Sequence, residues 1–271
     1  MIAIVIVTFN SSIELLKKIF EELSKKNAIF ISDNGSHNIA EIKKLIDRYD
    51  NIFLIENKEN IGIAKAQNIV INKIERLKQY RFILFLDDDS FVTQDTLNKL
   101  ITDYYKINKK YDRIACLSLT NTTNEKGIVS VDQAINSGML VSVENIKKIG
   151  NFCSELFIDM VDYEWCWRAR KSGYAIMLDY NCHFIHQIGR KRGRLNKDVP
   201  APFRLYYVFR NTIYLMKTKR VIKKDKNRLY FFLIKQFIYN ILFAPNKILR
   251  LRYMLKGIID GKKENMGKLK K

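Results

Sequence analysis

The segment with the clearest chemical potential is Asp87-Asp88-Asp89, which directly follows the apolar run FILFL at 82–86. Three adjacent carboxylates repel one another unless a cation or a proton compensates their charge. Carboxylate oxygens are preferred ligands of Mg²⁺ and Mn²⁺, and phosphate oxygens often complete the coordination. The alternative is an acidic turn that only caps the next helix. At the end of a buried strand, the segment favours a divalent metal site.

A second acidic segment, Asp162-Tyr163-Glu164, precedes Trp165 and Trp167. A positioned carboxylate can take a proton from a reacting hydroxyl group, a step typically worth about 10²–10⁴-fold in rate. The residues leave open which acid acts, and Asp162 can equally cap the helix that follows it. The tryptophans either stack on a ligand or pack in the core, and core packing is expected for at least one of them.

Two of the three histidines, His183 and His186, lie three residues apart in a strand-like stretch. Side chains alternate between the faces of a strand, so this spacing lets one of them point into a site while the other is structural. A glycine-containing loop with four basic residues follows: Arg190, Lys191, Arg192 and Arg194. Since guanidinium groups suit phosphate geometry, this loop either clamps a diphosphate or is simply a solvated charged loop.

Apolar runs that alternate with amphipathic segments must position these residues. Strands are expected at 2–7, 28–32, 52–56 and 82–86, and helices at 12–25, 39–48, 62–79 and 93–107. Continuous Val, Ile, Leu and Phe mark strands that are buried on both faces, so the pattern predicts a parallel sheet of βαβ units. Ligands bind beyond the carboxyl ends of such strands. Three polar clusters therefore converge on one rim: Thr8-Phe9-Asn10, Asp33-Asn34-Gly35 and Asp87-Asp88-Asp89.

The second half of the chain changes in texture. Strand-like sequence at 113–142 precedes helices at 143–149 and 162–172 and strands near 174–179 and 182–187. After Pro200 and Pro202, basic and aromatic helices are expected at roughly 203–217, 226–243 and 246–257, followed by a frayed tail. This division predicts an α/β catalytic domain over residues 1–200 and a helical extension over 201–271.

The charge is as unevenly distributed as the structure. The chain has 271 residues, 47% of them hydrophobic, which is typical of a folded protein and not of a disordered one. Residues 1–185 contain 24 basic and 24 acidic side chains, whereas residues 186–271 hold 24 basic and 4 acidic ones. A neutral body with a cationic extension indicates an anionic membrane, a nucleic acid or an acidic polymer as partner. Lysines that merely decorate exposed helices are the alternative.

Three further features bear on the compartment. The four cysteines at 116, 153, 166 and 182 form no CxxC pair, so free thiols in a reducing compartment are expected. The apolar N-terminal run lacks a preceding basic segment and a cleavage site, so it is expected to be a strand and not a signal peptide. The stretch 229–243 is too short and too polar to span a bilayer, and it reads as an interfacial helix, a dimer contact or a helix packed on its own domain.

The ordered segments VTFN, DNGS, NIGIAKAQN and FLDDDS resemble the family 2 glycosyltransferases of the GT-A fold. Later segments, NSGML, VDYEWCWRARKSGY and RLYYVFRN, resemble the rhamnosyltransferases of that family. The resemblance covers about residues 2–211. It implies a Rossmann-like, mixed but mainly parallel sheet flanked by helices, with a basic helical extension at the C-terminus.

The resemblance also implies roles for single residues. Thr8, Phe9 and Asn10 would line the nucleotide base and ribose, Asp33 would bind the base, and Asn60, Gly62 and Lys65 would lie beside the nucleotide. Asp87 and Asp88 would lie near the ribose and metal, and Asp89 and His186 would hold the metal. Asp162 would be the catalytic base, although Val161 stands where the family more often has Glu, and Glu164 is its rival. Asn136, Ser137 and Gly138 would border the donor sugar, and Arg204, Tyr206, Tyr207, Arg210 and Asn211 would face the acceptor or membrane.

The activity implied is that of a metal-dependent inverting glycosyltransferase using Mg²⁺ or Mn²⁺. It would move L-rhamnose from dTDP-rhamnose to a bacterial cell-surface polysaccharide or its lipid-linked precursor. The enzyme is expected in the cytoplasm, peripheral at the inner face of the anionic cell membrane, with the C-terminal helices as a homodimer contact and no nucleic-acid partner.

Three alternatives remain at this stage. The donor can instead be a UDP-hexose or UDP-galactofuranose, because sugar specificity rests on a few pocket contacts. A basic nucleic-acid-binding protein would show salt-sensitive affinity but would leave the three aspartates unexplained. An inactive membrane scaffold would have lost acidic residues, whereas Asp33, Asp87, Asp89 and Asp162 are all present.

Overall fold

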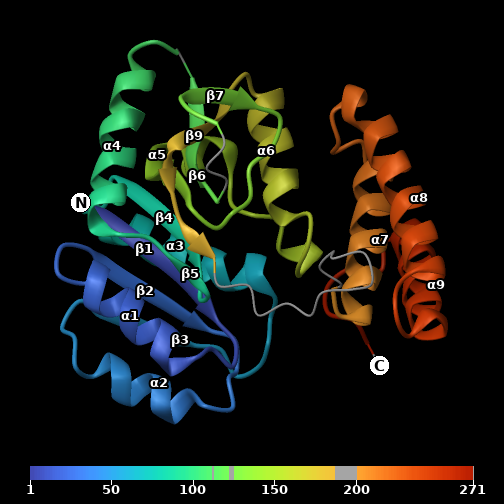
Figure 1. The fold of residues 1–271 in the computed structure, drawn as a ribbon, viewed down its shortest axis with the longest axis horizontal. Coiled ribbons are helices and arrows are strands. Elements are labelled where there is room, and N and C mark those ends of the chain that lie inside the picture. Colours follow the sequence, from blue (N-terminus) through green and yellow to red (C-terminus); the bar gives the residue numbers. More distant parts are fainter. Residues whose placement is uncertain (112, 122–124, 187–199, 271) are drawn as a thin grey trace.

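The polar strand ends meet because their strands lie side by side in one sheet. The structure is a computed structural model that describes residues 1–111, 113–121, 125–186 and 200–270. Its main sheet has eight strands in the order β3-β2-β1-β4-β8-β6-β9-β7, and all but β7 and β8 run in the same direction (Figure 1). The strands are β1 (Ile2–Thr8), β2 (Ala28–Asp33), β3 (Ile52–Glu56), β4 (Phe82–Asp87), β6 (Ile114–Thr120), β7 (Ile128–Val131), β8 (Met139–Ser142) and β9 (Ala175–His183). The mixed, mainly parallel sheet is confirmed.

The strand register brings the polar ends to the same rim. β1 pairs with β2 so that Thr8 lies opposite Asp33, and with β4 so that Val7 lies opposite Asp87. Just beyond this rim, the short strands β5 (Ser90–Phe91) and β10 (Ile185–His186) pair antiparallel, with His186 opposite Ser90. The chain after β9 therefore returns to the turn that carries the three aspartates.

Alternating side chains of the sheet are buried under helices on both faces. Ile4 and Ile6 face a core formed with α1 (Ile13–Leu23), α2 (Ile39–Ile46) and α4 (Gln94–Asn108). Ala3 and Val5 face the opposite core, formed with α3 (Ile63–Leu77), α5 (Val143–Ile149) and α6 (Val161–Lys171). This double burial is the physical reason for the continuous apolar runs in the sequence.

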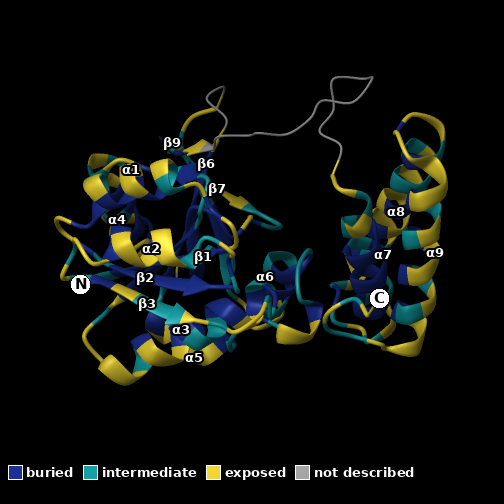
Figure 2. Cartoon of the chain, turned by 90° about the horizontal axis from the view of Figure 1, so that it is seen from below, coloured by how far each residue is buried: buried dark blue, intermediate teal, exposed yellow. Residues whose placement is uncertain are grey.

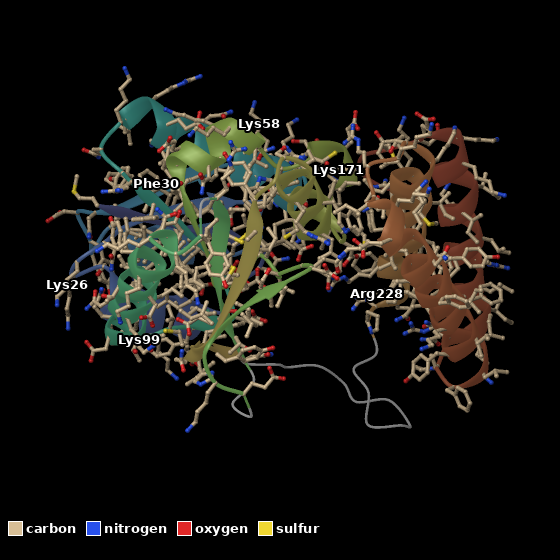
Figure 3. The ribbon with its side chains drawn as sticks, turned by 90° about the horizontal axis from the view of Figure 1, so that it is seen from above. Lys26, Phe30, Lys58, Lys99, Lys171 and Arg228 are labelled. Atoms are coloured by element: carbon tan, nitrogen blue, oxygen red, sulfur yellow. The ribbon has the colours of Figure 1, made fainter. Side chains whose placement is uncertain are left out.

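Three C-terminal helices pack beside the α/β body: α7 (Pro202–Lys217), α8 (Lys226–Leu242) and α9 (Lys247–Lys263). Figure 2 shows α7 largely buried, whereas α8 and α9 expose long faces. Gly257 and Gly261 let α9 approach α7 closely, since a Cβ would lie 2.5 Å from the Tyr206 carbonyl oxygen and 2.6 Å from that of Arg210. At the junction, the Lys171 amino group donates to the carbonyl oxygens of Lys219 and Arg220 at 2.7 and 2.8 Å (Figure 3).

The C-terminal tail corrects one prediction. It was expected to fray, but the Gly267 amide donates to the Glu155 carbonyl oxygen and the Leu269 amide to the Tyr207 hydroxyl, both at 2.9 Å. Lys268 adds an ion pair with Glu59 at 2.7 Å. The tail is therefore held by these polar contacts, together with Met266, which is partly buried against the hydrophobic core.

The structure also bears on the expectations for the cysteines, for the strand at 182–187 and for the helices. All four cysteines are free, as predicted. The strand expected at 182–187 is divided, because β9 continues to His183 and only Ile185–His186 forms the separate β10. Among the described helices, none combines the length and the apolar character needed to cross a membrane.

Candidate active site

A cavity of about 550 Å³ opens beyond the carboxyl end of β4 and unites the two acidic segments. The turn after β4 contributes Asp87, Asp88 and Asp89, and the start of α6 with its preceding loop contributes Asp159 and Asp162. The other polar and aromatic lining residues come from the ends of β6 and β9, from the turn before β8, from α6 and from the C-terminal helices: Asn121, Phe184, Asn136, Ser137, Tyr163, Arg204 and Phe232.

The aspartates after β4 are held by neighbouring hydroxyl groups. The Asp87 amide donates to Ser137 Oγ at 3.0 Å, and Ser11 Oγ donates to the Asp88 carboxylate. Burial, with further repulsion from Asp89, Asp88 and Asp162, raises the pKa of Asp87 to about 7. Burial also raises the pKa of Asp88, although its hydrogen bond from Ser11 opposes the shift.

This donor set suits a hard divalent cation. A carboxylate whose pKa is raised by burial and by neighbouring carboxylates, such as Asp87, gains most from a nearby positive ion. The three aspartates of the turn offer oxygen ligands, which is the chemistry that Mg²⁺ and Mn²⁺ select. The residues after β4 therefore fit the predicted metal.

Asp162 lines the same cavity from the first turn of α6. Its Oδ1 accepts a hydrogen bond from the Tyr163 amide at 2.9 Å, which fixes the carboxylate orientation. Burial raises its pKa to about 6, and backbone groups of Tyr163, Asp162 itself and Asn136 limit the shift. The N-cap of α6 is Met160, so the alternative in which Asp162 only caps the helix is wrong. A carboxylate with this pKa is ionised at neutral pH and still basic enough to accept a proton.

Glu164, the rival candidate for the base, forms an ion pair with Arg168. Both of its carboxylate oxygens accept from Nε of Arg168, at 2.8 and 3.1 Å, and its side chain is buried. Arg168 also donates to the carbonyl oxygens of Ile149 and Asn151 at 2.8 and 2.6 Å. Glu164 therefore joins α6 to the end of α5 and does not line the cavity.

Both tryptophans are core residues, so the stacking alternative is wrong. Trp165 and Trp167 are fully buried. The indole nitrogen of Trp165 donates to the Gly150 carbonyl oxygen at 2.9 Å, and that of Trp167 donates to Asp225 at 3.1 Å. Neither ring is available to an acceptor sugar.

The ends of β1 and β2 form a hydrogen-bonded unit that does not line the 550 Å³ cavity. The buried Asp33 carboxylate accepts from Thr8 Oγ1 at 2.8 Å, from Ser36 Oγ at 2.5 Å, and from the amides of Gly35 and Ser36 at 3.0 and 2.9 Å. A carboxylate has about four acceptor positions, so these bonds occupy Asp33 fully. A nucleotide base that binds Asp33 must displace one of these donors.

Phe9 and Asn10 sit at the exposed edge of the same unit. The Phe9 side chain is 48% exposed. Asn10 adopts a left-handed conformation, its amide donates to Ser36 Oγ at 2.8 Å, and its Oδ1 accepts from the His37 amide at 2.8 Å. The exposed ring therefore lies on a backbone that neighbouring side chains hold in place.

The N-x-G turn lies against the loop before α6. Asn60 Oδ1 accepts from the Gly62 amide at 3.0 Å, and the next amide, of Ile63, donates to the Phe157 carbonyl oxygen at 2.8 Å. Gly62 has φ +85°, and a Cβ there would lie 2.6 Å from the same carbonyl oxygen. Glycine is thus required by both conformation and space, while Lys65 is exposed and does not line the cavity.

His186 was predicted to hold the metal. Its side chain lies outside the described part of the structure, although its backbone pairs with Ser90. The basic loop with Arg190, Lys191, Arg192 and Arg194 also lies outside the described residues. Among the other described residues, Asn136 donates to Gln67 Oε1 at 2.8 Å and so anchors the turn that borders the cavity.

Comparisons with known proteins establish the family of this chain. Residues 3–130 match the model of a family described as glycosyl transferase family 2. Over 239 residues, which are 80% of this chain and 80% of the relative, the sequence is 31% identical to the dTDP-rhamnosyl transferase RfbF of Shigella flexneri. The chain belongs to glycosyl transferase family 2.

Solved structures support the fold of this glycosyltransferase. Residues 1–349 of TarS from S. aureus match with a TM-score of 0.58 and 14% identity, covering 97% of this chain and 81% of TarS. GalNAc-T7, in a structure with UDP, GalNAc and Mn²⁺, matches with a TM-score of 0.62 and 13% identity, covering 97% of this chain and 56% of GalNAc-T7. At these identities the likeness concerns the fold, which is GT-A.

Two features of α7 were not foreseen by sequence reasoning, which expected Arg204, Arg210 and Asn211 at the acceptor or membrane side. The first is the two-pronged ion pair that Arg204, a residue lining the cavity, makes with Asp159. The second is the burial of Arg210 and Asn211. Asn211 Nδ2 donates to the carbonyl oxygens of Leu156, Ile158 and Asp159 at 3.0, 2.8 and 2.8 Å.

These contacts fix the loop that leads to Asp162. Phe157, Asp159 and Met160 all have positive φ, which is unfavourable for residues with side chains. Arg210 supports the same loop, since it donates to the Leu156 carbonyl oxygen at 2.9 Å. The glycosyltransferase therefore uses a buried Arg-Asn pair of α7 to hold a strained loop beside Asp162.

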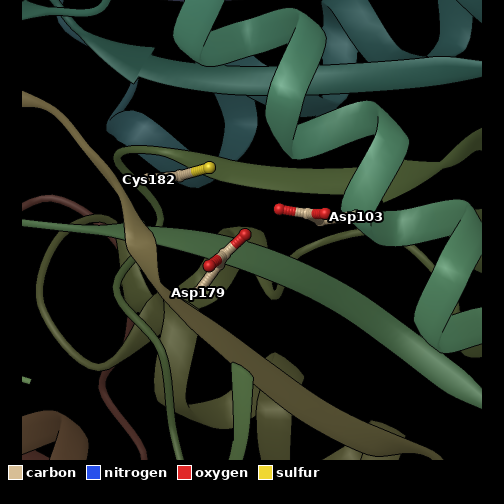
Figure 4. A group of neighbouring side chains, drawn as sticks. All are labelled: Asp103, Asp179 and Cys182. Carbon is tan, nitrogen blue, oxygen red and sulfur yellow. The ribbon is translucent and has the colours of Figure 1, made fainter. Parts of the chain in front are cut away.

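One further group of metal-ligand side chains lies away from the cavity. Within the described residues, Asp103 of α4 and Asp179 and Cys182 of β9 form the one set of three whose ligand atoms all lie within 4.8 Å (Figure 4). Lys99 and Lys106 pair with Asp103 at 2.6 and 3.0 Å and compensate its charge. We interpret this group as an ion-pair network between α4 and β9.

Proposed function

We propose that this glycosyltransferase transfers L-rhamnose from dTDP-rhamnose to a glycan acceptor with inversion of configuration. The observation that carries the proposal is that Asp162 lines one cavity together with Asp87, Asp88 and Asp89. The named activity of the Shigella flexneri relative supports the choice of donor. UDP-hexose and UDP-galactofuranose are the donors that the test below must exclude.

In the proposed reaction, Asp162 accepts the proton of the acceptor hydroxyl as that oxygen attacks the anomeric carbon. The Tyr163 amide holds the carboxylate in place, and a pKa near 6 keeps it ionised at neutral pH. In this single displacement, the bond from the acceptor oxygen to the anomeric carbon forms as the bond to the nucleotide diphosphate breaks on the other face of the sugar. The configuration is therefore inverted.

We propose that Asp89 and Asp87 hold a divalent cation, with His186 as a further ligand. Mg²⁺ typically takes one or two carboxylates and leaves its remaining positions to phosphate oxygens and water, so an open turn is sufficient. When bound, the ion supplies Lewis-acid stabilisation of the departing diphosphate. Asp88 supports the turn through its hydrogen bond from Ser11.

For the nucleoside, we propose the edge formed by Thr8, Phe9, Asn10 and Asp33, with Asn60, Gly62 and Lys65 on its far side. The exposed Phe9 ring offers an apolar surface on which a base can stack. The Asp33 network keeps the strand ends at a fixed spacing for it. Asn136, Ser137 and Gly138 border the proposed sugar position.

We also propose that residues 201–271 bind the inner, anionic face of the cell membrane, where a lipid-linked acceptor would be presented. α8 and α9 expose a set of large apolar side chains: Tyr230, Phe231, Ile234, Ile238, Leu242, Ile248, Leu249, Leu255 and Ile259. Exposed Lys235, Lys247, Arg252 and Lys256 accompany them. Apolar burial and about 1 kcal/mol per basic residue near the surface together support peripheral binding.

The donor is tested by thermal unfolding of the purified protein with dTDP-, UDP- and GDP-sugars, in Mg²⁺ or Mn²⁺ and again in EDTA. We expect metal-dependent stabilisation by dTDP-rhamnose above the others, and transfer of rhamnose to a lipid-linked glycan. Preference for a UDP-sugar would change the donor. Absence of stabilisation by every sugar nucleotide would contradict the proposal.

The membrane surface is tested by sedimentation with vesicles of phosphatidylglycerol and phosphatidylcholine. Phe231→Ser with Ile248→Ser should weaken binding, whereas Leu77→Ser, an exposed apolar residue at the end of α3, should not. Loss of a dimer in the double variant with unchanged vesicle binding would instead assign this face to a homodimer.

A further inference from the structure

The acidic cavity contains a single basic side chain among its described lining residues, Arg204, against five carboxylates. The formal charge of the whole chain is +20, so this local excess of negative charge is unusual for the molecule. A diphosphate that enters such a cavity meets charges of its own sign, which disfavours binding unless a positive group faces it. Arg204 is the described side chain placed to do so.

Arg204 is already paired in the free enzyme. Its Nε donates to Asp159 Oδ2 at 3.3 Å, and its terminal nitrogen donates to Oδ1. The Arg204 side chain is 36% exposed and that of Asp159 14%, so the pair is reached from the cavity. Partly exposed ion pairs contribute little stability, and phosphate oxygens offer a guanidinium the same two-pronged geometry as a carboxylate. Exchange of the Asp159 carboxylate for phosphate oxygens at Arg204 therefore costs little free energy.

The fold fixes both members of this pair. Arg204 lies in the first turn of α7, which the buried Arg210 and Asn211 attach to the loop before α6. Asp159 has φ +64°, and Asn211 Nδ2 holds its carbonyl oxygen at 2.8 Å. A non-glycine residue in this conformation is costly, so the chain maintains strain at the position that brings the Asp159 carboxylate to Arg204.

We propose that Arg204 binds a diphosphate group of a substrate and that Asp159 is its counter-ion, which is exchanged for phosphate oxygens on binding. This inference rests on the proposed function and adds to it a residue outside the segments expected to contact phosphate. The diphosphate belongs to the nucleotide donor or to an isoprenyl-diphosphate-linked acceptor, and both present the same group.

The two members of the pair predict effects of opposite sign. Arg204→Gln removes the phosphate contact, so dTDP should bind roughly 10- to 100-fold more weakly. Asp159→Asn removes the competitor and one negative charge, so dTDP should bind more tightly. Arg204→Lys keeps the charge without the fork and should lie between wild type and Arg204→Gln. A purely structural ion pair predicts instead that Arg204→Gln and Asp159→Asn act alike.

The experiment is isothermal titration of the full chain with dTDP and thymidine, and with geranyl diphosphate and geraniol, in EDTA and in Mg²⁺. Titration in EDTA isolates the contribution of the protein's own cations. If Arg204→Gln weakens the binding of dTDP alone, the inference is supported and the diphosphate belongs to the donor. If it weakens the binding of geranyl diphosphate alone, the inference is supported and the diphosphate belongs to the acceptor. Thymidine and geraniol binding should not change.

Arg220→Gln is the matched control, because the Arg220 side chain is 38% exposed and faces Glu164 at 3.9 Å, outside the cavity. It should leave dTDP binding unchanged, and thermal unfolding checks that each variant is folded. The inference is overturned if Arg204→Gln retains wild-type diphosphate affinity, or if both pair variants weaken it. Failure of the wild-type enzyme to prefer either diphosphate over its alcohol would instead refute the proposed function.

Discussion

Replacing Asp162 by Asn should abolish transfer and at the same time stabilise the protein. The half-buried Asp162 carboxyl has a pKa of about 6, against 3.8 for an exposed Asp. The folded state therefore binds more protons than the unfolded state between these values, and ionisation costs stability as pH rises through this window. A shift of about two units corresponds to about 3 kcal/mol at neutral pH, a cost that the uncharged Asn avoids.

Two measurements on Asp162→Asn test this reasoning. In EDTA, the gain in unfolding free energy over wild type should be close to zero at pH 4 and approach about 3 kcal/mol at pH 7, since Asn retains an acceptor for the Tyr163 amide. Transfer by wild type should fall about tenfold at pH 5, one unit below the pKa, while the variant should lose at least about 10²-fold at pH 7. Transfer at near wild-type rate would refute the base assignment, and equal stability gains at pH 4 and 7 would refute burial of the charge.

Three further substitutions separate positioning from chemistry. Gly62→Ala should lower the free energy of unfolding in urea by about 2 kcal/mol or more. The substitution combines a positive φ with a Cβ 2.6 Å from the Phe157 carbonyl oxygen. An unchanged urea midpoint would show that the turn relaxes freely. Glu164→Gln should lower the free energy of unfolding by about 3 kcal/mol, because Arg168 loses its carboxylate partner. Transfer per folded molecule should be retained. Loss of transfer in the folded variant would restore Glu164 as a candidate base. Asn211→Ala removes three hydrogen bonds from the loop before α6, so kcat should fall at least about tenfold while thymidine affinity is retained; an equal loss of thymidine affinity would indicate general unfolding.

Much of the site follows from the sequence because parallel strands end at a common rim. The apolar runs predict β1, β2, β3 and β4, and the polar residues after them then converge without knowledge of any contact. The directions of β7 and β8 were beyond this reasoning, since strand-like sequence at 113–142 carries no signal for orientation. Hydrogen-bond partners were also hidden, and this is why Asp33 could be expected to bind a nucleotide base and Glu164 could be considered as a catalytic base.

The contribution of α7 could not be predicted because it depends on a contact between segments some fifty residues apart. One signal was present: the helix is apolar or aromatic on most sides, which indicates burial all round, and Arg210 and Asn211 interrupt it. Polar residues in such a helix must find partners. The loop before α6 supplies these partners as backbone carbonyl oxygens, which no side-chain pattern reveals.

The same connection links the proposed membrane surface to the chemistry. α9 packs on α7 where Gly257 and Gly261 allow the two backbones to approach. The exposed faces of α8 and α9 therefore belong to the same unit as Arg204, which lines the cavity, and Asn211, which holds the loop before α6. Phe232 of α8 lines the cavity itself. If α8 and α9 lie on a bilayer, the cavity is held at a fixed height above the lipid with an aromatic side chain at its mouth. An acceptor then reaches Asp162 from the membrane side, and substitutions such as Phe231→Ser should reduce transfer to lipid-linked acceptors more than transfer to short soluble ones.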